Sequence, residues 1–359
     1  MQHDDRLLPA AGAAVLTAAT AKRGRDEQGA AVTSTGHNNT ASLRAGGLCS
    51  ELASRRGLPL IGSAGSYDAI LAFELAPPWT ARLVGSRASD AALDAAMDFA
   101  GRHGRKVRVL ALEPDAVRAG VRVLWLARDP GNPARFVRHE YEVPRGALAQ
   151  TIERLAAGGD AGIEPVAGGE AGSARRDILV CTHGARDACC GKFGYPIYRE
   201  LCRLAGNARS GSEPVKIWRT SHLGGHRFAP TLLDLPSGRM FGRLTIGDAE
   251  AVLGGGQPLV DRLAAIYRGH CGLPEAAQIV ERDLWLASGS AFPAAALSWN
   301  VDAAGSDWHV EMCARSDLHG ECTSIVRVTR CKSSAVSTPP SCGRDPEVES
   351  PWQIVERVA

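Results

Sequence analysis

The segment over residues 177–206 reads DILVCTHGARDACCGKFGYPIYRELCRLAG. The apolar run over 177–180 predicts a buried strand, and the apolar spacing over 195–205 predicts a helix whose first turn holds Pro196. The loop between them carries three cysteines and one histidine: Cys181, Cys189, Cys190 and His183. A loop of this kind between a strand and a helix is a candidate site for a metal, an iron–sulfur cluster or a reactive thiol pair.

The elements around this segment occur in the same order twice along the chain. After it, the pattern predicts a strand over 215–221, a hairpin of 230–235 and 240–244, and a helix from about Asp248. Before it, the predicted strands are 69–75, 106–112, 121–128 and 136–143, and the predicted helices are 88–103 and 146–157. Both halves are therefore close to β-α-β-β-β-α, the element order of a thioredoxin-type layer of helices on a small mixed sheet.

This repeated order predicts an α/β fold with two thioredoxin-like lobes, over 47–158 and 174–270, joined by a linker rich in Gly, Ala and Glu. Only the second lobe carries the cluster of cysteine and histidine. In the remaining part, 271–359, the pattern predicts a helix and a small antiparallel sheet. The helix spans 275–287, and the strands are 297–301, 308–313 and 324–328.

The composition favours a small molecule or a protein as partner, rather than nucleic acid or a membrane. Lys plus Arg number 41 against 39 Asp plus Glu, and no run of five like charges occurs. The first 46 residues contain few large apolar groups and predict a disordered tail, in which the apolar stretch over 10–19 is too short to cross a bilayer. Ten cysteines in 359 residues are too dilute for a disulfide scaffold, which favours a reducing compartment and a cytoplasmic location.

Two spacings in the second lobe indicate a metal site. Cys181 and Cys190 have eight residues between them, and His222 and His226 lie in the stretch SHLGGHRF. Thiolates and imidazoles suit zinc or an iron–sulfur cluster rather than calcium or magnesium. The pairs meet if the strands that precede them are parallel neighbours, and the two glycines between the histidines favour an open loop over a helix. The spacing is wider than a zinc knuckle, so it favours a two-iron cluster, with zinc as the alternative.

The same residues carry a resemblance to a known family. The stretches CTHGARDACCGKFG and VKIWRTSHLGGHRFAPTLLDLPSGRMFGRL resemble the sucrase/ferredoxin-like family, whose ferredoxin part is thioredoxin-like and has the motif C-x8-C followed by H-x-G-G-H. A looser similarity extends to PLIGSAGS, FELAPPW and YRGHCGL, so that it covers roughly residues 47–290.

The resemblance implies that Cys181, Cys190, His222 and His226 bind a 2Fe-2S cluster, with the cysteines on one iron and the histidines on the other. Two neutral imidazoles in place of two thiolates raise the reduction potential above that of an all-cysteine ferredoxin. No dinucleotide fingerprint follows a strand, so we expect single electrons to come from another redox protein or a small reductant.

Other functions have weaker support in the sequence. No carboxylate pair or nucleophile elbow marks a hydrolase, and no catalytic residue is assigned. The alternatives are a zinc-stapled structural or interaction module without redox activity, and thiol exchange through Cys189 and Cys190.

Several further side chains have ordinary structural interpretations. We expect His183 to be a loop residue, and Arg186 and Asp187 to stabilise the cysteine loop, with tuning of the cluster charge as the alternative for Arg186. The thiols of Cys49, Cys202 and Cys271 are predicted to pack in cores, and His270 to be structural. The remaining cysteines, 313, 322, 331 and 342, match no ligand spacing.

Overall fold

A computed structural model describes residues 47–102, 104–132, 134–166, 175–206, 215–294, 296–316 and 320–358. The predicted tail over 1–46 lies outside the described residues, as does the second half of the predicted linker. None of the helices in the described part of the chain is both long enough and apolar enough to cross a membrane.

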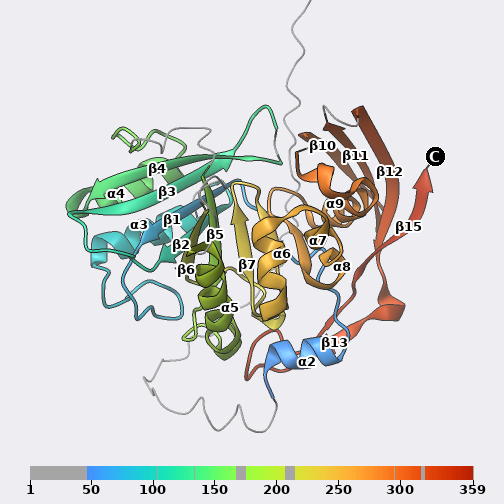
Figure 1. Ribbon diagram of the computed structural model, residues 1–359, viewed down its shortest axis with the longest axis horizontal. Helices are drawn as coiled ribbons and strands as arrows, with labels where there is room; N and C mark the ends of the chain where they lie inside the picture. The colour runs from blue at the N-terminus through green and yellow to red at the C-terminus, as the bar shows by residue number, and fades with distance from the viewer. Residues whose placement is uncertain are drawn as a thin grey trace, which may run out of the picture. The chain divides into compact units, whose positions relative to one another are not determined.

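One mixed sheet of nine strands, formed within the described ranges, runs through both halves of the chain (Figure 1). Its order is β4-β3-β1-β2-β6-β5-β7-β8-β9. The first half contributes β1 Ala69–Glu74, β2 Val107–Leu112, β3 Gly120–Arg128 and β4 Phe136–Pro144. The second half contributes β5 Arg176–Cys181, β6 Val215–Thr220, β7 Leu232–Leu235, β8 Arg239–Phe241 and β9 Tyr267–His270.

The two halves have the same strand order and the same strand directions. In the first half β1 is parallel to β2, antiparallel to β3, and β3 is antiparallel to β4. In the second half β5, β6, β7 and β8 repeat this pattern. The halves join where β2 meets β6 in an antiparallel contact between Leu112 and Thr220. The predicted α/β fold with a repeated element order is thus present, while the predicted lobe boundaries stay a prediction.

Each half-sheet has one face covered by helices of its own half. In the first half these are α3 Ala91–Arg102 and α4 Leu148–Ala156, whose apolar side chains pack with Leu71 and Phe73 of β1. In the second half they include α5 Ala188–Gly206 and α6 Ala249–Gly254. Figure 1 shows α5 and α6 lying against β5 and β7.

The opposite faces of the two half-sheets share one core. Ile70 and Ala72 of β1 pack there with Leu179 of β5 and Trp218 of β6. Strands buried on both faces need apolar residues at successive positions, which explains the continuous apolar runs in β1 and β5.

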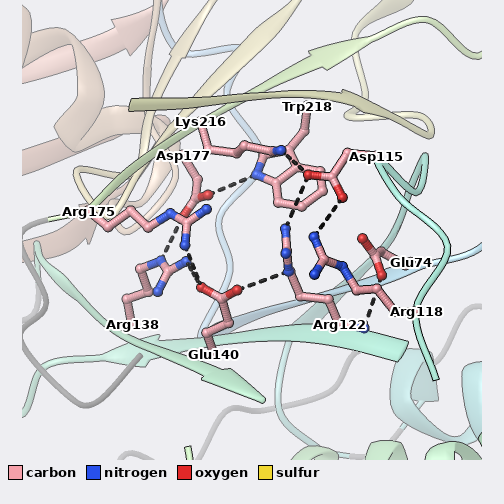
Figure 2. A network of polar contacts seen from close by, with 10 residues as sticks. All are labelled: Glu74, Asp115, Arg118, Arg122, Arg138, Glu140, Arg175, Asp177, Lys216 and Trp218. Atoms are coloured by element: carbon pink, nitrogen blue, oxygen red, sulfur yellow. Dashed lines mark hydrogen bonds and ion pairs between the residues drawn. The ribbon is translucent and has the colours of Figure 1, made fainter. Parts of the chain in front are cut away.

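Buried ion pairs also join the halves (Figure 2). Arg138 of β4 lies between two carboxylates, with its Nε 2.5 Å from Asp177 Oδ2 and its Nη2 2.7 Å from Glu140 Oε2. Asp177 also accepts a hydrogen bond of 2.8 Å from Trp218 Nε1, and Arg122 Nε lies 3.0 Å from Glu140. The β3–β4 hairpin of the first half is thereby tied to β5 and β6 of the second.

The helix that follows the cysteine loop begins earlier than predicted. It starts at Ala188, so Pro196 lies inside α5 and the prediction of a first-turn proline is wrong. Asp187 Oδ1 accepts a hydrogen bond of 2.9 Å from the Cys189 amide, as a helix-capping carboxylate does. Two glycines of this segment allow close packing of α5: Gly194 lies against the end of β5 at Cys181, and Gly191 lies against Gly184 of the cysteine loop.

The C-terminal part contains the predicted helix, α9 Glu275–Ser288, and the predicted antiparallel sheet. The sheet has four described strands: β10 Ala296–Ala304, β11 Asp307–Ser316, β12 Gly320–Arg330 and β15 Trp352–Val358. The last of these was not predicted. Between β12 and β15, β13 Val336–Thr338 pairs with β14 Glu347–Glu349. Figure 1 shows β13 beside α2 Cys49–Arg55.

Candidate metal centre

Three of the four predicted ligands come together at the carboxyl ends of β5 and β6. Cys181 ends β5, Cys190 lies in the first turn of α5, and His222 follows β6. The His222 Nδ1 atom is 4.0 Å from Cys181 Sγ and 3.9 Å from Cys190 Sγ. All three ligand atoms lie within 4.8 Å of one another. They meet because β5 and β6 are parallel neighbours, so both loops leave from the same edge.

The fourth predicted ligand, His226, lies beside this group. Its ring stacks on that of His222 with centroids 4.9 Å apart. Its Nε2 is 4.0 Å from Asp187 Oδ2, while its Nδ1 is buried without a hydrogen-bond partner. A metal-bound imidazole commonly turns its second nitrogen to a carboxylate or a carbonyl. At 4.0 Å the Asp187 carboxylate is near His226 without accepting a hydrogen bond from it, and the buried Nδ1 is the nitrogen that has no partner.

The loop between the histidines is the open loop that the glycines predict. Gly224 and Gly225 have φ of +90° and +69°, which a side chain rarely adopts. A Cβ atom on Gly225 would also lie 2.7 Å from Cζ of Arg268. A substitution there therefore introduces both backbone strain and a clash.

Arg268 holds this loop to the first half of the chain. Its side chain is almost fully buried and donates hydrogen bonds to the Gly224 carbonyl, at 3.0 Å, and to Ser63 Oγ, at 3.1 Å. Burial lowers the pKa of Arg268 to about 10, so the guanidinium stays charged at neutral pH. Arg108 donates to the carbonyl of His222 in the same loop. Sequence reasoning missed both arginines, although Arg268 lies in the quoted stretch YRGHCGL.

The thiols of Cys181 and Cys190 are fully buried, and their pKa values shift in opposite directions. Burial by itself raises the pKa of Cys181, but contacts with Cys190 and His222 outweigh it, and the pKa falls well below its ordinary value. Contact with Cys181 and burial raise the pKa of Cys190. The pair therefore loses one proton readily and holds the second, which a bound cation would displace. Burial lowers the pKa of His226, so its ring is neutral, as a ligand requires.

Other residues of the cysteine loop have structural contacts. His183 Nε2 donates to the Thr80 carbonyl at 2.9 Å, and its ring lies edge-on to Trp79, with centroids 5.6 Å apart. His183 thereby fastens the loop to the first half, as expected of a loop residue. Arg186 is exposed, so the buried arginine near the thiols is Arg268.

Five of the other thiols are either core residues or members of a second group. Cys271 packs in the shared core and Cys202 packs partly against the core of the second half, as predicted. Cys49 is buried, as predicted, but its sulfur belongs to a group of ligand atoms within 4.8 Å of one another. That group is Cys49, Asp187, Cys189 and Cys342. The sulfur of Cys189 thus faces these residues, a set that no sequence spacing indicated.

Comparison with known proteins assigns the middle of the chain to a family. A family model described as sucrase/ferredoxin-like matches residues 60–269, more than half of the chain. The match includes all four predicted ligands but neither Cys49 nor Cys342. No curated protein matches the chain, and no solved structure does.

Proposed function

Because this chain belongs to the sucrase/ferredoxin-like family, we propose that it is a one-electron redox protein that holds a 2Fe-2S cluster. The proposed ligands are Cys181, Cys190, His222 and His226. The observation that carries the proposal is the convergence of two buried thiols with two stacked imidazoles, one of which has an unpartnered buried Nδ1. This donor set fits a cluster that takes up and returns single electrons.

The surroundings favour a potential above that of an all-cysteine ferredoxin. Two neutral imidazoles in place of thiolates remove negative charge, and plant-type ferredoxins with four cysteines lie near about −400 mV. The buried guanidinium of Arg268 acts in the same direction, because a positive charge nearby stabilises the reduced cluster.

The exposure of the ligands supports electron transfer through the histidines. The side chains of Cys181 and Cys190 are fully buried, whereas His222 and His226 are partly exposed. We infer that the donor, a redox protein or a small reductant, approaches the side of the site where His222 and His226 are exposed. The cysteines whose side chains the structure describes are free thiols, which supports the proposed cytoplasmic location.

One observation favours a second candidate, a zinc-stapled module without redox activity. Ligand atoms on one tetrahedral zinc are separated by about 3.3–3.8 Å. The His222 Nδ1 atom lies only slightly farther than this from the two sulfurs, at 4.0 and 3.9 Å.

Metal analysis separates the two candidates. We expect protein purified without oxygen to contain iron and acid-labile sulfide in equal amounts, to be red-brown and to bleach with dithionite. Cys190→Ser should lose both iron and sulfide, whereas the control Cys202→Ser, in the same helix but outside both groups, should keep them. His226→Cys should keep the cluster and lower its potential. Colourless protein without sulfide, in which Cys190→Ser removes zinc, would refute the proposal and favour the zinc module.

A further inference from the structure

Three cysteines from distant parts of the chain converge on one buried carboxylate. Cys49 opens α2, Cys189 lies in the first turn of α5, and Cys342 lies between β13 and β14. Their sulfurs are 3.5 Å apart for Cys49 and Cys189, 3.3 Å for Cys189 and Cys342, and 3.6 Å for Cys342 and Cys49. Asp187 Oδ1 lies 3.7 Å from Cys49 Sγ and 3.2 Å from Cys342 Sγ.

These separations correspond to four ligands on one tetrahedral ion. With Zn–S bonds of about 2.3 Å and a Zn–O bond of about 2.0 Å, tetrahedral angles place two sulfurs about 3.8 Å apart and a sulfur and an oxygen about 3.5 Å apart. The observed sulfur separations of 3.3–3.6 Å need only small adjustments to reach this geometry. A disulfide, in contrast, requires about 2.0 Å between two sulfurs and leaves the third thiol and the carboxylate unused.

The carboxylate of Asp187 is oriented toward the sulfurs by its own hydrogen bonds. Its side chain is fully buried, and its oxygens accept from Ser341 Oγ at 2.8 Å and from the amides of Cys342 and Cys189, both at 2.9 Å. A buried carboxylate surrounded by thiols is unfavourable unless a cation accompanies it. Ligands of structural metal sites are commonly fixed by such outer hydrogen bonds.

We propose that Cys49, Cys189, Cys342 and Asp187 bind one structural zinc ion, separate from the 2Fe-2S site. Three thiolates and a carboxylate are ligands that zinc accepts, and four protein ligands leave no open position for catalysis. This proposal does not depend on the redox function, and two of the ligands lie outside the family match.

The zinc ion would fasten both ends of the described chain to the redox site. It joins α2 and the segment between β13 and β14 to the first turn of α5, which also carries Cys190. Asp187 additionally lies 4.0 Å from Nε2 of His226. The two sites therefore meet at Asp187, and the neighbouring residues Cys189 and Cys190 serve one site each.

Metal analysis of single-cysteine variants tests the proposal. We expect one zinc per chain in the wild type after removal of loosely bound metal. Cys49→Ser and Cys342→Ser should each weaken zinc binding by more than about 100-fold, since changes to outer hydrogen bonds alone cost 10–100-fold. Both variants should keep the metal of the other site. The control Cys331→Ser, in the same C-terminal part but outside both groups, should bind zinc like the wild type.

Zinc-edge X-ray absorption of the wild-type protein covers the case in which the variants fail to fold. We expect three sulfur ligands and one oxygen ligand. A shell of two sulfurs and two nitrogens, zinc that is lost only with Cys181→Ser, or protein without zinc and with a Cys189–Cys342 disulfide would each overturn the proposal.

Discussion

Gly194 lies where α5 passes over the end of β5, and replacing it with alanine tests how the cysteine pair is positioned. A Cβ atom on Gly194 would lie 3.1 Å from the carbonyl carbon of Cys181 and would overlap the carbonyl oxygen. The carbonyl oxygen is the nearer of the two atoms, and Cβ atoms do not approach other heavy atoms more closely than about 3.0 Å, so α5 would have to move by about 1 Å. The obstacle is strand backbone, which cannot rotate away as a side chain can.

This displacement has a cost in stability and in metal binding. Overpacking of this kind costs typically about 1–3 kcal/mol. Alanine has a higher helix propensity than glycine by up to about 1 kcal/mol, so we expect a net loss of about 1–2 kcal/mol. Because metal-ligand distances tolerate only about 0.2 Å, the shift of Cys190 relative to Cys181 should also reduce iron and sulfide content.

The assay combines chemical denaturation with metal analysis, and Gly206→Ala in the same helix is the matched control. A Cβ atom on Gly206 meets nothing within 4 Å, so this variant should be at least as stable as the wild type and equally loaded. Gly194→Ala with wild-type stability and wild-type metal content would refute the contact between α5 and β5 as described.

Two further predictions concern buried titratable side chains, the neutral His270 and the charged Arg138. Burial lowers the pKa of His270 to about 3, so the unfolded chain binds the extra proton first as pH falls below about 6.5. The free energy of unfolding should therefore drop by about 2 kcal/mol between pH 7 and pH 5. His270→Asn, measured by urea unfolding at both pH values, should remove this drop. Equal pH dependence in the variant and the wild type would contradict the reasoning. Arg138→Met leaves Asp177 and Glu140 buried without their shared cation, and we expect a loss of about 3–5 kcal/mol. The control Arg203→Met, at an exposed pair, should change the unfolding midpoint far less, and similar effects of both variants would show that burial of the network is unimportant.

The sequence by itself determined most of the local elements and the residues of the first proposed ligand set. Apolar runs identify β1 and β5 because strands buried on both faces need apolar side chains at successive positions. The spacings within C-x8-C and H-x-G-G-H identify Cys181, Cys190, His222 and His226, since each pair is local along the chain. Their meeting could also be inferred, because a βαβ unit brings the carboxyl ends of its strands together.

Features that depend on the path of the chain were decided only by the tertiary structure. The early start of α5 depends on Asp187 and on close packing against β5, whereas its glycines indicate a loop when read alone. The joining of the two half-sheets depends on the antiparallel contact of β2 with β6, and on the core and the buried ion pairs that the halves share. Arg268 has an ordinary sequence context and becomes a buried cation beside the thiols through folding.

The group of Cys49, Asp187, Cys189 and Cys342 is the clearest example of a feature that the sequence could not predict. Spacing indicates a metal site only when its ligands lie close along the chain, as in the pair of Cys181 and Cys190. Cys49, Cys189 and Cys342 are separated by more than a hundred residues each, so no local pattern connects them. They meet because α2 and the segment after β13 both pack at Cys189 in the first turn of α5, a convergence that results from packing.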